Sequence, residues 1–80
     1  MSKQIKLDGG LDIDGAKVKA LNMREPTVND QLAAADIKGS NARQEVALFA
    51  NLCEVTPEDI GRLTLKDYRK LQEAYADFTD

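Results

Sequence analysis

The sequence has no histidine, no tryptophan and only one cysteine. Histidine is the commonest general base and the commonest metal ligand, so its absence removes the usual means of acid–base catalysis. Cys53 has no histidine to activate its thiol, and we expect it to be a small buried residue. A structural zinc site needs four Cys or His ligands. We therefore expect no catalytic, cofactor-binding or metal-binding residue, and we predict that the chain is not an enzyme.

One acidic segment, Asp12-Ile13-Asp14-Gly15, is similar to part of a calcium-binding loop. The ligand spacing of such a loop does not fit this sequence, because its first and last ligand positions would be Gly10 and Leu21, which carry no carboxylate. A hairpin turn at Asp14-Gly15 is the simpler interpretation, since glycine accepts positive φ. Gly9-Gly10 lacks the residues that follow in a phosphate-binding loop.

Long apolar runs are also missing. No run approaches the roughly 20 residues that a membrane-spanning helix needs, and Met1–Gln4 lacks the apolar stretch of a signal peptide. The single cysteine excludes an intrachain disulfide, which fits a reducing compartment. We therefore expect a cytoplasmic protein with no membrane partner.

The charge is unevenly distributed along the chain. Residues 1–24 carry five positive and three negative charges, a net of +2, and residues 25–80 carry six and eleven, a net of −5. The acidic C-terminal part repels phosphate backbones, and no aromatic residue lies between the lysines of residues 1–24 to stack on bases. We therefore expect no general nucleic-acid binding.

The 80 residues are enough for a single domain, residues 1–80, with two patterns in it. Apolar residues alternate from Ile5 to Met23, which predicts a β-hairpin or short meander over residues 3–24. The alternation shifts by one residue after Val18, so we expect a bulge or a change of register near Ala20. Gly9-Gly10 is expected to interrupt the first apolar run.

The rest of the chain, residues 27–79, has helical patterns. Pro26 ends the strand and Thr27 is a helix N-cap, with Asp30 as its capping-box partner. Helices are predicted from there to about Lys38, over 42–54, over a short 57–63 and from Thr64 onward. Thr64, with Asp67 three residues on, is expected to cap the last helix. On the first helix, Val28, Leu32 and Ala35 fall on one face, and the small residues of the helix would let it approach a neighbour closely. The fold class is therefore α+β, a hairpin followed by three or four helices.

Two helices have more apolar surface than one buried face needs. Apolar side chains cover more than half of the helix over 42–54, and the last helix has an aromatic stripe with the spacing of a helix that lies in a groove. Most of these residues would form the core. Our hypothesis is that some of them bind a partner; the candidates are Leu48, Phe49, Leu52, Tyr75 and Phe78.

The segment Leu21-Asn22-Met23-Arg24-Glu25-Pro26-Thr27, followed by Asp30, resembles the "lREPT..D" signature of the E-type tail assembly chaperones of contractile-tailed bacteriophages, such as P2-like and Mu-like phages and prophages. Further along, Glu45–Leu48 and Leu52 are similar to the "e..lla.l" helix of that family. Pro57–Ile60, Leu63 and Asp67-Tyr68 are similar to its C-terminal pattern. The resemblance covers nearly the whole chain, and Gly9-Gly10 departs from it.

The resemblance implies a chaperone that binds the long, helical, apolar tape measure protein and keeps it soluble until the tail tube polymerises. It implies action in the cytoplasm of the host bacterium and absence from the mature virion. A frameshift-extended form of the chain and a homo-oligomer are further partners that we expect. Arg24, Glu25, Pro26, Thr27 and Asp30 are interpreted as structural residues of the strand-to-helix corner. The alternative is a small DNA-binding regulator, with 57–63 as part of a helix-turn-helix.

Overall fold

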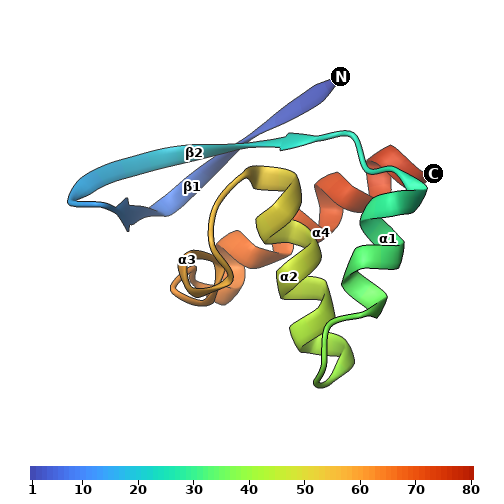
Figure 1. Cartoon of the computed structure of the whole chain (residues 1–80). Helices are drawn as coiled ribbons and strands as arrows, with labels where there is room; N and C mark the ends of the chain where they lie inside the picture. Colours follow the sequence, from blue (N-terminus) through green and yellow to red (C-terminus); the bar gives the residue numbers. More distant parts are fainter.

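A two-stranded antiparallel hairpin and four helices make up the chain (Figure 1). The computed structural model describes all 80 residues, Met1–Asp80. The strands are β1 (Ser2–Ile13) and β2 (Ala16–Arg24), and the helices are α1 (Val28–Ala35), α2 (Asn41–Cys53), α3 (Pro57–Gly61) and α4 (Leu65–Thr79). The predicted α+β class is confirmed, with a hairpin and no third strand.

The hairpin changes register between Lys6 and Leu11. Lys6 pairs with Ala20 and Leu11 pairs with Val18, so four residues of β1 face the single Lys19 of β2. The irregularity predicted near Ala20 is therefore present, but the extra residues lie in β1. Gly9-Gly10 bends β1 and does not end it; Gly10 has a φ of 68°, which glycine adopts without strain.

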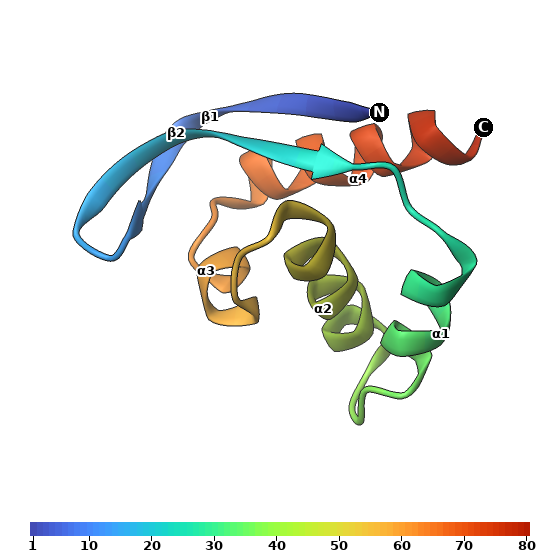
Figure 2. The same cartoon turned by 45° about the horizontal axis from the view of Figure 1, so that its top comes forward.

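Twelve buried apolar residues form the core between the hairpin and the helices. Alternate residues of the strands point to one face of the hairpin, where they meet α2, α3 and α4. Figure 2 shows the hairpin lying across α4, with α2 and α3 below it. Each fully buried large side chain stabilises the fold by about 1.5 to 3 kcal/mol. The core residues are Ile5, Leu7, Leu11, Leu21, Met23, Phe49, Ala50, Leu52, Cys53, Ile60, Leu71 and Ala74.

Each helix begins at a side-chain cap. Thr27 and Thr56 form complete capping boxes with Asp30 and Asp59, as the sequence predicts for α1. Helix α1 is shorter than predicted, because Asp36 is already its C-cap and Gly39 adopts a φ of 127° in the connection to α2. This early end makes α1 only eight residues long.

Candidate functional site

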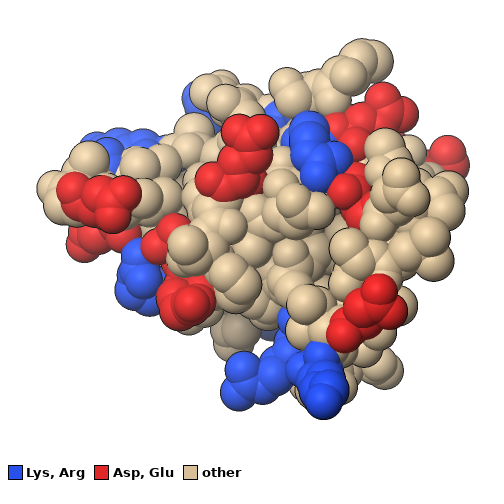
Figure 3. All heavy atoms as spheres, in the orientation of Figure 1, with Lys and Arg blue, Asp and Glu red and all other residues tan.

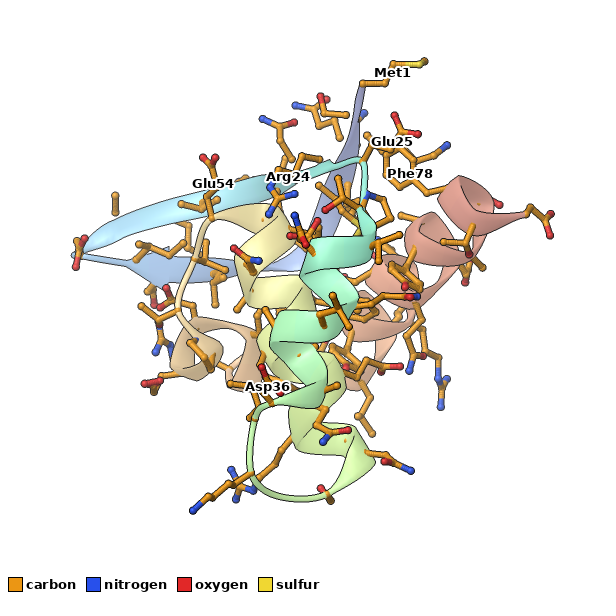
Figure 4. All side chains as sticks on the ribbon, turned by 45° about the vertical axis from the view of Figure 1, so that its right-hand side comes forward. Met1, Arg24, Glu25, Asp36, Glu54 and Phe78 are labelled. Atoms are coloured by element: carbon orange, nitrogen blue, oxygen red, sulfur yellow. The ribbon has the colours of Figure 1, made fainter.

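The corner between β2 and α1 is built around the buried carboxylate of Asp30; Arg24 and Glu25 of this corner are labelled in Figure 4. Arg24 donates from Nη1 and Nη2 to its two oxygens, each at 2.8 Å. The Thr27 backbone N–H donates at 2.8 Å, and the Asn51 amide of α2 donates at 3.2 Å. The Arg24 guanidinium, with the Thr27 donors, holds the pKa of Asp30 well below its usual range although burial opposes this. Asp30 therefore joins β2, α1 and α2.

The other two residues of the Arg24–Thr27 segment lie at the surface of the corner. Glu25 is exposed; its side chain is 3.8 Å from the N-terminal amine, and its backbone N–H donates to the Met1 carbonyl at 3.0 Å. Pro26 is partly buried and stands between strand and helix. The contacts of the whole segment are within the domain, and they set the direction in which α1 leaves the hairpin.

Asp67 of α4 is a second buried carboxylate, and its main role could not be foreseen from the sequence. Its backbone N–H donates to the Thr64 hydroxyl, as the expected cap requires. Its carboxylate instead accepts from the backbone N–H groups of Asp8 and Gly9, each at 3.0 Å. Burial would raise the pKa of Asp67, but these two donors and Lys70 outweigh it and lower the pKa. Asp67 therefore holds the bent part of β1 against α4.

The five candidate partner-binding residues divide into two groups. Phe49 and Leu52 are 1% and 0% exposed, so they give the folded monomer no surface for a partner. Leu48, Tyr75 and Phe78 are partly buried. The Tyr75 hydroxyl accepts a hydrogen bond from Gln31 at 3.1 Å, and the Phe78 ring lies 5.3 Å below the Lys3 ammonium. These three side chains have an accessible edge, and the remaining two are core.

Helix α1 turns Asp30, Ala33 and Ala34 toward α2 and leaves Val28 and Leu32 exposed. Asp30 is its only buried residue, whereas Val28 is 73% exposed and Leu32 58% exposed. The face that Val28 and Leu32 share is therefore exposed, and the small residues Ala33 and Ala34 are the ones that lie beside α2. The contacts of Asp30 with Arg24 and Asn51 turn the opposite side of the helix toward α2. We call the outward face with Val28 and Leu32 the α1 apolar face.

Hydrogen bonds, more than apolar burial, attach α1 to the domain. At its C-terminal end, the Gln44 amide of α2 donates to the carbonyls of Ala35 and Ile37, at 3.5 and 3.1 Å. Near its middle, Gln31 donates to Tyr75. A helix attached in this way leaves its apolar side chains free. Exposed apolar side chains that gather on one element typically mark an interaction surface.

Cys53 is buried at the end of α2, and burial raises the pKa of its thiol to about 11. A thiol with this pKa is almost wholly protonated at neutral pH and is a poor nucleophile. No group of three or more His, Cys, Asp or Glu side chains is arranged to hold a metal ion. None of the helices has the length and apolar character required to cross a membrane.

Helix α3 does not have the features of a DNA-recognition helix. It spans five residues, and its first turn carries Glu58 and Asp59. The first turn of a recognition helix contacts base edges in the major groove, where two carboxylates would be repelled by the phosphates. The geometry of α3 therefore gives no support to the regulator alternative.

Comparison with known proteins gives one result. The family model described as "Phage tail assembly chaperone proteins, E, or 41 or 14" matches residues 4–80. No curated protein matches the chain, and no solved structure does. The match covers nearly every residue of the hairpin and all four helices. The chain therefore belongs to this family of phage tail assembly chaperones.

Proposed function

We propose that the protein binds the tape measure protein of its phage and keeps it soluble during tail assembly. The observation that carries this proposal is the α1 apolar face, where Val28 and Leu32 are exposed on a member of a tail assembly chaperone family. A long, apolar, helical client needs apolar surface on its chaperone, because burying such surface is the main favourable term in association. Binding of this kind is stoichiometric and needs no catalytic group.

The rest of the molecule suits a soluble carrier. The net charge of −3 favours solubility of the chaperone and of its complex with an apolar client. On this proposal the protein acts in the cytoplasm of the host bacterium and is absent from the finished virion. A frameshift-extended form and further copies of the chain stay predictions from the family resemblance.

Co-expression tests the proposal directly. The tape measure protein of the same phage is produced with and without this chain, and its soluble fraction is measured. We expect the soluble fraction to rise several-fold with the wild-type chain. The double variant Val28→Gln/Leu32→Gln should lose most of this rise, because it makes the α1 apolar face polar without touching the core.

Leu65→Gln is the matched control. Leu65 is 74% exposed and lies at the start of α4, outside α1, so its replacement removes the same kind of surface elsewhere. We expect Leu65→Gln to behave as the wild type. A tape measure protein that stays insoluble with the wild-type chain would overturn the proposed function.

A further inference from the structure

A shallow groove runs along α2 between α1 and α3. It consists of two adjoining hollows of about 210 and 750 Å³, which share Ile37 and Ala47. We call it the α2 groove. Figure 3 shows this face as mostly uncharged surface between the helices. Its apolar lining comes from Ala33, Ile37, Val46, Ala47, Leu48 and Pro57.

The shape of the groove fits a helix. The α2 residues of the lining run from Ala42 to Asn51, which gives a groove floor of about 15 Å, or between two and three helical turns. Ala47, partly buried in the middle of the floor, has a side chain small enough for a partner helix to approach closely. Apolar side chains spaced at three and four residues on a partner helix would then meet Ile37, Val46 and Leu48.

The charge at one end of the groove selects the partner. Lys38 and Arg43 line the larger hollow, and neither is in any of the eight ion pairs of the domain. In Figure 3 basic side chains gather at this lower end, below the connection of α1 and α2. Glu58 is the one acidic residue that lines the larger hollow, and Asp30, which lines the smaller one, is already paired with Arg24. On a chain of net charge −3, two unpaired cations against one anion favour a partner with carboxylates.

We propose that the α2 groove binds one amphipathic helix of the client, with Asp or Glu residues beside the apolar stripe of that helix. This inference rests on the proposed function for the identity of the client as the tape measure protein. The α1 apolar face and the α2 groove lie on opposite sides of α1. A client helix bound in the groove therefore leaves Val28 and Leu32 exposed, where they can contact a second segment of the client.

Two synthetic 20-residue helical peptides test the charge preference. Both have the same Leu and Ala stripe; one has Glu beside the stripe and the other Lys. Fluorescence anisotropy at low salt should show the Glu peptide binding the wild-type chain at least tenfold more tightly than the Lys peptide. The double variant Lys38→Glu/Arg43→Glu should lose this preference. Equal binding of the two peptides to the wild type would overturn the inference.

Lys19→Glu/Arg69→Glu is the matched control, because both residues are exposed, unpaired and outside the groove. It makes the same change in net charge and should keep the preference for the Glu peptide. If the control variant weakens binding of the Glu peptide as much as the groove variant does, the preference for the Glu peptide comes from net charge and the inference is wrong.

A steric pair tests the floor of the groove. Ala47→Gln should weaken binding of the Glu peptide at least tenfold, whereas Ala76→Gln, at an exposed position of α4 outside the groove, should not.

Light scattering shows whether a second copy of the chain fills the groove instead. A dimer that Ala47→Gln dissociates would overturn the inference. If the wild type solubilises the tape measure protein but the Ala47 and Lys38/Arg43 variants do so equally well, the groove inference fails and the proposed function stands.

Discussion

Arg24 and Asp30 form a bidentate ion pair, in which Nη1 and Nη2 of Arg24 each lie 2.8 Å from one carboxylate oxygen of Asp30. The pair joins the last residue of β2 to the first turn of α1. The same carboxylate also accepts from Thr27 and from Asn51 of α2. One buried side chain thus sets the position of a helix that buries none of its apolar residues, so the α1 apolar face depends on this polar contact.

Asp30→Ala should lower the free energy of unfolding by about 2 kcal/mol. The change removes the capping-box acceptor of the Thr27 backbone N–H, a hydrogen bond worth about 1 kcal/mol, and leaves Arg24 and Asn51 without their acceptor. The loss is expected to be smaller than the roughly 3 to 5 kcal/mol that breaking a fully buried ion pair costs, because the Arg24 side chain is 39% exposed. Urea denaturation measures the change. Asp77→Ala, at an exposed residue 4.0 Å from Lys3, should stay within about 0.5 kcal/mol of the wild type.

The stability of the domain should fall in acid and change little near neutrality. The pKa values of Asp30 and Asp67 are lowered by folding, so their contribution is fully present above the pKa of an unfolded Asp, about 3.9. It is lost as the pH falls through the lower folded values. No histidine titrates between pH 5 and 8. Urea midpoints should therefore be level from pH 7 to about 5 and decrease below about pH 4.

Asp67→Asn separates the contribution of this carboxylate from general acid unfolding. An amide at this position cannot titrate, and its NH2 group, which only donates, replaces one of the two oxygens that accept from Asp8 and Gly9. We expect a lower midpoint at pH 7 and a smaller decrease between pH 5 and 3 than in the wild type. An unchanged decrease would mean that other acids carry the pH dependence.

Much of the fold was predictable because local signals were strong. Thr27 with Asp30 gave the start of α1, and Asp14-Gly15 gave the turn, where both residues adopt positive φ. The alternation of apolar residues gave the buried face of the hairpin. In each case the information lies within a few residues of the feature that it determines, so a sequence read by itself contains it.

Contacts between distant residues were not predictable. The sequence pattern predicts Asp67 only as the capping partner of Thr64, but its carboxylate binds β1, nearly sixty residues earlier in the chain. The outward orientation of Val28 and Leu32 also follows from a distant contact, that of Asp30 with Asn51. Apolar periodicity identifies a face of a helix, and it does not say whether that face is covered. For the same reason apolar periodicity alone does not show that Phe49 and Leu52 are core residues and not partner-binding ones.

Gly10→Ala should destabilise the domain by about 1 kcal/mol. Gly10 has a φ of 68°, where a Cβ atom is unfavourable, and an added Cβ would lie 2.7 Å from Cε of Lys17, a flexible side chain that can move aside. Gly61→Ala is the contrasting variant, because nothing lies within 4 Å of its added Cβ. It should be neutral or stabilising by up to about 1 kcal/mol. Equal changes in thermal unfolding temperature for Gly10→Ala and Gly61→Ala would show that the positive φ of Gly10 does not cause the loss of stability.

Phe49 and Phe78 should differ sharply when each is replaced by Ala. Phe49 is fully buried, with Tyr68 and Tyr75 rings 5.6 and 5.7 Å from its own, so Phe49→Ala should cost about 3 to 5 kcal/mol. This is a large part of the stability of a small domain, and circular dichroism should show a poorly folded protein. Phe78 is only partly buried under Lys3, so Phe78→Ala should remain folded. If Phe78→Ala is folded but solubilises less tape measure protein than the wild type, Phe78 contacts the client; unchanged solubilisation would remove it from the candidate contacts.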